Sequence, residues 1–482
     1  MKKEALWKNF KMDKYPKLTK NMQTDILIVG GGLTGGSLFY QLRDDKRKVT
    51  LVERSTLGMG ATGRSSAKIT FLQENIYTKL ANNFDEFIAS LYYESQKLAI
   101  EKMKEIIKKE KIDCDFKASS SYLYTLIEDE VEDIKREKEL LSSFKELVKE
   151  IDILPNGMKV KKGFYVNDTY VFHPLKYLNA IAKKGIKKDH EIYENTNVIN
   201  VVKKDDLYYC YTKDAIITCK ELVIATHYPN FLVPFLFPIK CYLEKSYILA
   251  KKEKDMKEFN AINISNPIYS IRYYNEFKLV VGASHNLCIK NNDTENVHEL
   301  QQLANIKNPT YIWSNHDIMT LDDLPYIGVL KEHLYLATGY NTWGMTNATL
   351  ASLVLYDLLN HQENRYSNLL SLQRGISKVK IIKYPLNIFS NVYSYMHSKI
   401  NVRKKWYHDN PYFTKFDGKN VAIYKDKTGK EHIVYIKCPH LKCNLIFNRV
   451  EETWDCPCHG SRFTLDGKCI MGPSNYDISY KK

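Results

Sequence analysis

The sequence predicts an α/β nucleotide-binding region near the N-terminus, a middle region of mixed helical and strand patterns, and a small metal-binding domain at the C-terminus. Two observations lead to this prediction. Near the N-terminus, an apolar β-type run leads into a glycine-rich turn and a helical pattern. Near the C-terminus, two matched pairs of cysteine and histidine residues have the character of metal ligands. With 482 residues, the chain is long enough for two or three domains.

The N-terminal signal has the order expected of a dinucleotide-binding unit. Residues 24–29 read TDILIV and precede a G-x-G-x-x-G turn that contains Gly30, Gly32 and Gly35. A helical pattern and a second apolar strand follow, and the strand ends in Glu53. Such glycines let backbone N–H groups approach a pyrophosphate, and an acid about 20 residues further on can hold a ribose hydroxyl. The motif alone leaves FAD and NAD open as the dinucleotide.

The C-terminal signal is a C-x-H pattern followed by a C-x-x-H pattern, in which each loop carries one cysteine and one histidine ligand. Two thiolates on one iron and two imidazoles on the other are the ligands of a Rieske [2Fe–2S] cluster. A Cys₂His₂ zinc finger has a different order, with both cysteines before both histidines. The sequence therefore favours a cluster over zinc or unrelated buried cysteines, with the ligands Cys438, His440, Cys456 and His459.

The surrounding residues 437–473, KCPHLKCNLIFNRVEETWDCPCHGSRFTLDGKCIMGP, resemble the Rieske domain family. In the Rieske proteins of quinol-oxidising complexes, one further cysteine on each loop forms a disulfide. The resemblance implies a disulfide between Cys443 and Cys458, with two free thiols as the alternative because disulfides are unusual in a reducing cytosol.

The same resemblance implies further contacts of the cluster. Ser461 matches the position that donates a hydrogen bond to a cluster sulfide, and residues 472–473 match the loop that covers the cluster. Phe463 stands where high-potential members have tyrosine, so one donor is missing. We expect a reduction potential below the top of the Rieske range.

A second resemblance covers the rest of the chain. The small-residue segment 54–70 resembles the flavin-contacting segment of the D-amino-acid-oxidase-like family, and the segments 222–227 (LVIATH) and 323–346 match later parts of it. In that family the last segment opens a helix whose N-terminus faces the isoalloxazine, and apolar spacing predicts that helix over 347–359. The resemblance favours FAD over NAD. The further contacts that we assign to FAD are Arg54, Gly60, Thr62, Lys68, Val198, Ala225, Thr226, Gly339, Tyr340, Gly344, Met345 and Thr346.

The two resemblances together imply an α/β Rossmann-like FAD-binding domain interleaved with an α+β substrate domain, plus a small all-β Rieske domain. Because a domain of about 74 residues has a small core, we expect the last one to unfold when iron is removed. The predicted bounds are a polar lead-in at 1–22; an FAD-dependent oxidoreductase at 23–375, with FAD-binding segments at about 23–75, 150–230 and 316–375 and substrate or helical segments at about 76–150 and 231–315; a linker at 376–408; and the Rieske domain at 409–482.

The charge of the chain, +15, does not indicate a nucleic-acid partner, because its 71 basic residues are mixed with 56 acidic ones as on solvated faces. The basic segment 399–406 is the best candidate for contact with an acidic partner or an anionic membrane, and a solvated linker is its alternative. The longest apolar run, 231–238, is too short to span a bilayer, and the lysine-rich residues 1–20 do not read as a signal peptide. We expect a cytoplasmic protein, with peripheral membrane contact left open.

A flavin beside a Rieske cluster suggests the conversion of a two-electron step into two one-electron steps. We expect a dehydrogenase that oxidises a small amine or amino-acid-like substrate and passes electrons to an external protein or quinone. Electron flow in reverse, an electron-transfer module without a small substrate, and a redox sensor are the alternatives. Arg272 is a weak candidate to clamp a substrate carboxylate and Lys68 a weak candidate to face the flavin, whereas His173 and His227 read as structural.

Overall fold

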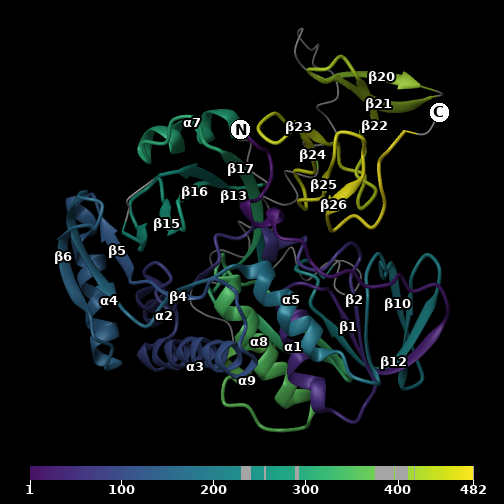
Figure 1. Cartoon of the computed structure of the whole chain (residues 1–482), viewed down its shortest axis with the longest axis horizontal. Helices are drawn as coiled ribbons and strands as arrows, with labels where there is room; N and C mark the ends of the chain where they lie inside the picture. Colours follow the sequence, from purple (N-terminus) through teal and green to yellow (C-terminus); the bar gives the residue numbers. More distant parts are fainter. Residues whose placement is uncertain are drawn as a thin grey trace.

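A computed structural model of the chain describes residues 1–229, 240–253, 257–287, 292–374, 396, 411–416 and 418–480. Apart from Met396, the predicted linker 376–408 lies outside the described residues, as do the basic segment 399–406 and the apolar run 231–238. Figure 1 shows the first sheet at lower right, the second sheet across the left and centre, and the C-terminal domain in yellow at upper right. Within the part of the chain that is described, no helix is long and apolar enough to cross a membrane.

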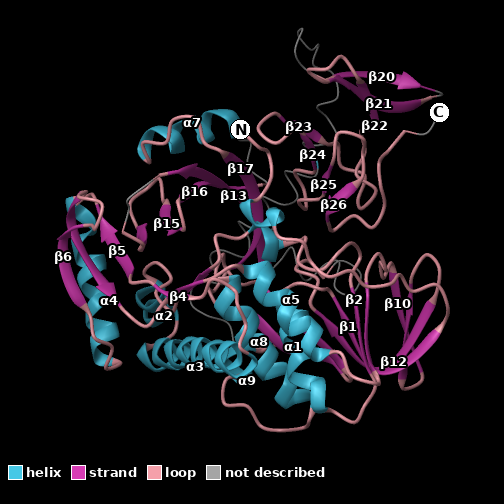
Figure 2. Cartoon of the chain, viewed as in Figure 1, coloured by secondary structure: helices cyan, strands magenta, loops and turns pink. Residues whose placement is uncertain are grey.

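The first sheet has a parallel centre, the arrangement of a Rossmann-like fold. β19, β12, β1, β2 and β9 run parallel, and β11 and β19 pair with successive parts of the same edge of β12. Beside it, the helix α1 (Leu33–Gln41) packs against both α5 (Pro174–Gly185) and α8 (Gly344–Leu359) (Figure 2). The strands are β1 (Met22–Val29), β2 (Val49–Val52), β9 (His190–Tyr193), β10 (Asn200–Lys204), β11 (Leu207–Tyr211), β12 (Ile216–Ile224), β18 (Tyr326–Lys331) and β19 (Leu334–Thr338).

The apolar character of β1 follows from burial on both sides of this sheet. Ile26 and Ile28 lie in the core that contains the helices, whereas Leu27 and Val29 lie in a second core on the opposite face. Successive side chains of a strand point to opposite faces, so a strand covered on both sides needs apolar residues throughout.

The second sheet is mixed and has the order β17-β13-β16-β15-β14-β5-β7-β6. The helices α4 (Val131–Ser143) and α7 (Asp293–Leu303) pack on its strands. The helices α2 (Ile76–Asn83) and α3 (Glu86–Glu110) pack against each other, and they also contact α4 and α8, respectively. Its strands are β5 (Ser121–Thr125), β6 (Lys149–Ile153), β7 (Lys159–Val166), β13 (Cys241–Lys252), β14 (Asn260–Asn263), β15 (Ser270–Tyr274), β16 (Phe277–Asn286) and β17 (Tyr311–Thr320).

The boundaries between the interleaved segments differ from those expected. Residues 76–150 contribute β5 to the second sheet as well as helices, and β6, which crosses the expected boundary at 150, and β7 in the expected FAD-binding segment 150–230 also belong to that sheet. The segment 316–375 likewise begins inside β17. The remaining elements outside the C-terminal domain are η1 (Leu6–Asn9), η2 (Leu42–Asp44), η3 (Ala61–Arg64), η4 (Glu128–Glu130), α9 (Ser367–Leu370) and the small sheet of β3 (Lys68–Ile69), β4 (Lys117–Ala118) and β8 (Tyr170–Val171).

The lead-in at 1–22 is not a plain polar segment. Ala5, Leu6 and Trp7 are buried in the main core, and the indole N–H of Trp7 donates to the carbonyl of Ser65 at 2.7 Å. This hydrogen bond fixes the small-residue loop that follows Glu53.

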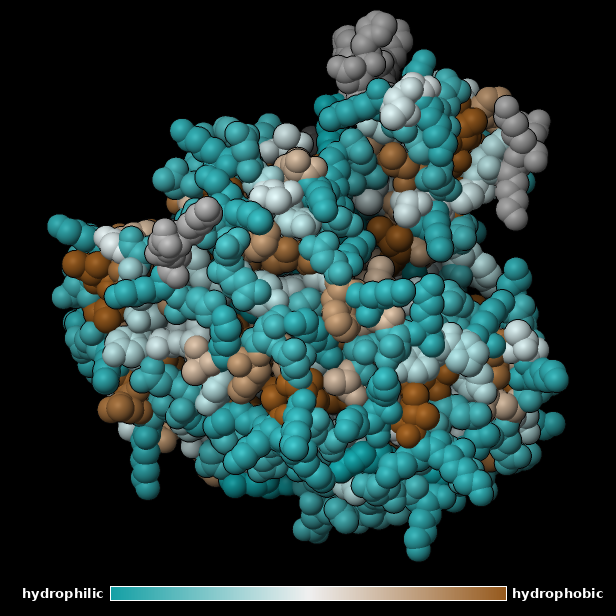
Figure 3. Space-filling model, viewed as in Figure 1, coloured by the Kyte–Doolittle hydropathy of each residue, from teal (hydrophilic) through white to brown (hydrophobic). Residues whose placement is uncertain are grey.

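The C-terminal domain is all-β, as predicted. It consists of two sheets. The first contains β20 (Tyr412–Phe416), β21 (Lys419–Lys425) and β22 (Glu431–Tyr435), and the second contains β23 (Ile446–Asn448), β24 (Thr453–Asp455), β25 (Arg462–Phe463) and β26 (Cys469–Met471). Its small core contains four cysteines of the ligand loops together with Trp454 and Phe463. The face of the molecule in Figure 3 is mostly hydrophilic, with hydrophobic residues in small separate groups, which agrees with the mixed charge of the sequence.

Candidate functional site

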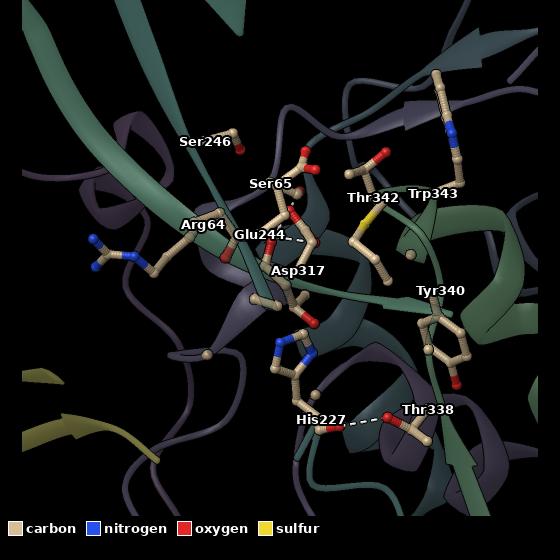
Figure 4. Close-up of a pocket in the computed structure, with 18 of the residues that line it drawn as sticks. Arg64, Ser65, His227, Glu244, Ser246, Asp317, Thr338, Tyr340, Thr342 and Trp343 are labelled. Carbon is tan, nitrogen blue, oxygen red and sulfur yellow. Dashed lines mark hydrogen bonds between the residues drawn. The ribbon is translucent and has the colours of Figure 1, made fainter. Parts of the chain in front are cut away.

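A cavity of about 950 Å³ lies where the two large sheets and the C-terminal domain meet. Its wall includes the glycine-rich turn of the first sheet, one face of β13 and β17 of the second, and residues 470–473 of the C-terminal domain. Figure 4 shows part of this wall, with His227 and Tyr340 on the side of the first sheet and Glu244 and Asp317 on the strands of the second.

The glycine-rich turn is shaped for close approach of a ligand at the start of α1. Gly30 has φ +117°, and a Cβ there would lie 2.5 Å from the carbonyl oxygen of Ala225. A Cβ on Gly32 would meet only the hydroxyl of Thr62, at 3.3 Å, so its open side faces the cavity. Glu53 accepts hydrogen bonds from the N–H groups of Gly31 at 2.8 Å and Ser55 at 2.9 Å, which fixes the turn against the end of β2. This cradle fits a dinucleotide pyrophosphate.

Most residues that the sequence assigned to FAD meet at this cavity. Gly35 does not line it but packs against the carbonyl oxygen of Gly30, and Thr346 instead bonds through its hydroxyl to the backbone of Thr70. The assigned residues in the wall are Gly30, Gly32, Glu53, Arg54, Gly60, Thr62, Lys68, Val198, Ala225, Thr226, Gly339, Tyr340, Gly344 and Met345.

The helix at the end of this set, α8, begins at Gly344 rather than Asn347. Trp343 precedes it and makes no side-chain capping hydrogen bond, so the sequence carried no capping signal for its start. The first turn supplies Gly344, Met345 and Ala348 to the cavity wall.

The two weak catalytic candidates have different surroundings. Lys68 lines the cavity, donates to the Ser270 hydroxyl at 3.0 Å, and lies 5.2 Å from the centre of the Trp343 ring. Burial, and then the charge of Arg272, lower the pKa of Lys68 to about 7. Arg272 is 1% exposed, donates to the backbone carbonyls of Ser66 and Phe172, and does not line the cavity. Its placement does not support a role as a carboxylate clamp.

Both histidines that read as structural have structural contacts. His173 caps α5, its Nδ1 accepting from the N–H of Lys176 at 3.3 Å. The carbonyl of His227 accepts from the Thr338 hydroxyl at 2.5 Å, but its ring lies in the cavity wall.

The sequence reasoning missed two carboxylates in the cavity wall, Glu244 on β13 and Asp317 on β17. Burial raises the pKa of each to about 7. The signal that could have revealed them is the run of polar residues in each strand, 244–246 and 314–317, but such a run is equally typical of a strand exposed to water.

The predicted cluster ligands converge at one end of the C-terminal domain. Cys438 is fully buried. Its thiol is hydrogen-bonded to the thiol of Cys456 and to the hydroxyl of Ser461. The rings of His440 and His459 are 5.0 Å apart. Within the described part of the chain, the Nδ1 atoms of both histidines are buried without a hydrogen-bond partner. Two thiols beside two unpartnered imidazole nitrogens fit the ligand set of a Rieske cluster.

The predicted disulfide between Cys443 and Cys458 is present and joins the two ligand loops. The sulfur of Cys456 lies within 4.8 Å of both sulfurs of this disulfide. Phe463 and Ser461 are fully buried beside the same loops. Residues 472–473 line the large cavity, and the N–H of Ser474 donates to the Ser461 hydroxyl at 2.9 Å.

Buried ion pairs join the C-terminal domain to the rest of the chain. Arg64 on the small-residue loop lies 2.6 Å from Glu451, and Lys245 on β13 lies 3.0 Å from Asp455. Arg462 binds both of these carboxylates from within the C-terminal domain. No local sequence pattern indicates this interface, because its members are far apart in the chain and are charged.

Three further contacts bring the C-terminal domain to the cavity. His316 Nδ1 is 3.1 Å from the carbonyl oxygen of Gly460, the residue after His459. The ring of His459 is 6.2 Å from that of Tyr228, which lines the cavity. Where the cavity wall contains Glu53, the next residue, Arg54, donates to the carbonyl of Ser474 at 3.1 Å. The cluster loops and the candidate FAD cavity are therefore neighbours.

Comparison with known proteins agrees with this division of the chain. Residues 25–358 match the family model of the FAD dependent oxidoreductases (DAO), and residues 399–480 match that of the Rieske [2Fe-2S] domain. YhfW of Bacillus subtilis (strain 168), whose name describes a Rieske 2Fe-2S iron-sulfur protein, is 31% identical over 497 residues, which cover 98% of this chain and 96% of YhfW. Gamma-glutamylputrescine oxidoreductase of Escherichia coli (strain K12) is 20% identical over 73% of this chain and 87% of its own.

Solved structures show the same fold for the larger part. Glycine oxidase from Geobacillus kaustophilus superimposes with a TM-score of 0.64 at 18% identity, over 73% of this chain and 99% of its own. L-proline dehydrogenase from P. horikoshii gives 0.60 at 17% identity, over 72% and 95%. The chain belongs to the FAD dependent oxidoreductase (DAO) family, and it carries a C-terminal Rieske [2Fe-2S] domain.

Proposed function

We propose that the protein oxidises a small amine or amino-acid-like substrate in the cavity and delivers the electrons singly, through the Rieske site, to an external protein or quinone. The observation that carries the proposal is the contact between the two candidate cofactor sites. Tyr228 lies in the cavity wall and against the ring of His459, and residues 470–473 of the Rieske domain complete the wall.

The comparisons support the substrate class only at the level of relatives. A relative over most of the larger part is named gamma-glutamylputrescine oxidoreductase, and neighbours in fold are named glycine oxidase and L-proline dehydrogenase. All three names refer to substrates that carry a nitrogen beside an oxidisable carbon.

The residues of the chain have distinct tasks in this proposal. When bound, FAD accepts a hydride from a carbon beside nitrogen, and a Rieske cluster passes on one electron at a time. Gly30 and Gly32 give backbone room for the pyrophosphate, and Cys438, His440, Cys456 and His459 hold the cluster. Lys68 is our candidate to take a proton from the substrate ammonium group at Nζ, because burial brings its pKa to about 7.

An anaerobic absorption titration of the purified holoprotein tests the proposal. A panel of amines, amino acids and hydroxy acids is added, and the flavin and cluster bands are followed separately. We expect an amine or amino acid to bleach the flavin band first and the cluster band afterwards. The variant His440→Ala should show only the flavin change. If dithionite reduces both centres and no compound of the panel does, the proposal fails and a protein or quinone donor is indicated.

A further inference from the structure

The wall of the cavity formed by β13 and β17 presents acceptor groups. The register of the two strands pairs Glu244 directly with Asp317, and both side chains line the cavity together with Asn315. Figure 4 shows Glu244 and Asp317 near one another in the centre of the view. Two ionised carboxylates that face each other repel, and either a proton or a bound cation relieves that repulsion.

Within the part of the chain that is described, no basic side chain forms an ion pair with either carboxylate, although the charge of Lys79 acts to lower the pKa of Glu244. The nearby Lys79 is engaged by Glu74 at 2.9 Å. Burial raises the pKa of Asp317, and the neighbouring charge of Glu244 raises it further. The pKa of Glu244 is raised mainly by burial and, to a smaller extent, by the charge of Glu74. The protein thus keeps acidic groups in a position that costs free energy without a bound cation.

Asn315 gives a second and independent indication of a donor ligand. Its Nδ2 donates to the two oxygens of Asp317 at 3.1 and 3.2 Å. Its Oδ1 is buried, and among the described residues it has no hydrogen-bond partner, although Asn315 is only 5% exposed and lies in the cavity wall. A buried amide oxygen without a donor is rare in native structures. An ammonium group carries three donors and no acceptor, which suits a wall of oxygens.

The cavity wall has few cationic side chains that are free to bind a substrate carboxylate. The two arginines in its wall are already held by the Rieske domain: Arg54 by the carbonyl of Ser474 and Arg64 by Glu451. Arg272 is bonded to backbone carbonyls outside the wall. Among the lysines and arginines of the described wall, only Lys68 has neither an ion pair nor a hydrogen bond to the Rieske domain. Its ammonium group donates to the hydroxyl of Ser270.

We propose that Glu244, Asp317 and Asn315 form a subsite for the distal ammonium group of a diamine or polyamine substrate. The subsite holds one end of the molecule, and the other end carries the carbon that is oxidised. This inference rests on the proposed oxidoreductase function and specifies its substrate as a cationic amine without a free carboxylate.

The test uses three ligands of matched length: 1,4-diaminobutane, n-butylamine and 4-aminobutanoate, which end in an ammonium, a methyl and a carboxylate group. Their affinities for the oxidised holoprotein are measured by anaerobic flavin difference spectra and by calorimetry. We expect 1,4-diaminobutane to bind most tightly and 4-aminobutanoate most weakly. Charge-assisted hydrogen bonds predict a preference of about ten-fold to one hundred-fold for the diamine over n-butylamine.

Two isosteric variants assign that preference to the wall. Glu244→Gln and Asp317→Asn should each reduce the affinity for 1,4-diaminobutane by about ten-fold or more and leave n-butylamine nearly unaffected. The matched control is Glu295→Gln, the same change at an exposed position of α7 outside the wall. Flavin absorbance and the Rieske electron paramagnetic resonance signal verify that each variant is folded and loaded.

The outcomes separate this inference from the proposed function. Unchanged diamine affinity in both variants, or tightest binding of 4-aminobutanoate, would overturn the subsite. Flavin reduction by an amino acid combined with that result would retain the oxidoreductase and reject the diamine. Diamine binding that depends on Glu244 and Asp317 supports the subsite, and if no amine then reduces the flavin, the proposed dehydrogenase activity alone is rejected.

Discussion

Glu451 is the residue whose change should most clearly release the Rieske domain from the cavity. It is 7% exposed and binds Arg64 of the flavin-binding part, Arg462 of its own domain, and the hydroxyl of Ser314. Burial alone would raise the pKa of this carboxyl, but Arg462 and Arg64 hold it below its ordinary value. Glu451 is therefore ionised and neutralises two buried guanidinium groups.

The size of the effect follows from the partners left behind. Glu451→Gln leaves Arg64 without its carboxylate, while Arg462 keeps Asp455. Removing one member of a buried ion pair costs about 3–5 kcal/mol. At 1.36 kcal/mol for each factor of ten, the docking equilibrium should shift by between about one hundred-fold and a few thousand-fold.

Distance measurement by pulsed electron paramagnetic resonance gives the readout. The reduced cluster serves as one spin, and a nitroxide on Asp133→Cys, an exposed position of α4, serves as the other. The parent protein should show one narrow distance distribution, and Glu451→Gln a broad one. The control is Glu452→Gln, because the ion pair of Glu452 with Lys3 is half-exposed and contributes about 0–1 kcal/mol.

One result would refute the reasoning. If Glu451→Gln retains its cluster signal and the same narrow distribution as the parent, the buried ion pairs do not hold the two domains together. A narrow distribution in Glu452→Gln together with a broad one in Glu451→Gln would attribute docking to the buried pair rather than to charge in general.

Three further changes have defined outcomes. Lowering the pH from 8 to 6 should weaken diamine binding progressively. The reason is that Glu244 and Asp317, with pKa values raised to about 7, lose their negative charge, while Lys68 gains a positive charge. Calorimetry at each pH measures the affinity, and a constant affinity would contradict the prediction. His440→Ala should abolish the Rieske paramagnetic signal while flavin absorbance is kept, and an unchanged signal would exclude His440 as a ligand. Gly32→Val should yield protein with the cluster but without FAD, because its side chain would enter the cavity rather than clash with the backbone; full flavin occupancy would count against the pyrophosphate cradle.

The features that could be predicted from the sequence depend on neighbouring residues. The turn at Gly30 needs a residue without Cβ because φ is +117° and the carbonyl of Ala225 is close, so glycine at that position is informative by itself. The two cluster loops are short and carry their ligands at fixed spacing, so the cluster could be predicted from the residues themselves. The disulfide between Cys443 and Cys458, the choice of FAD and the fold class were implied by the two family resemblances.

The features that could not be predicted depend on packing between distant segments. β5 and β6 lie among helices in the sequence but pair with the second sheet, through contacts that no local pattern specifies. Arg272 looked suited to a substrate carboxylate on its strand, but its guanidinium reaches the carbonyls of Ser66 and Phe172, far away in the chain. Trp7 lies in a segment of polar composition but is buried in the core.

β13 and β17 explain why the site itself was the hardest part to predict. Successive side chains of a strand face opposite sides. On β17, Asn315 and Asp317 face the cavity, whereas His316 between them contacts Gly460 of the Rieske domain. On β13, Glu244 faces the cavity, whereas Lys245 pairs with Asp455.

Polar residues on both faces of a strand ordinarily indicate exposure to water, and here they indicate a cavity on one side and a docked domain on the other. Because one pair of strands carries both sets, a shift of register by one residue would exchange them and destroy both. The same geometry separates the two functions for experiment: changes at Glu244 or Asp317 should alter ligand binding without releasing the domain, and changes at Glu451 should release the domain without altering the amine subsite.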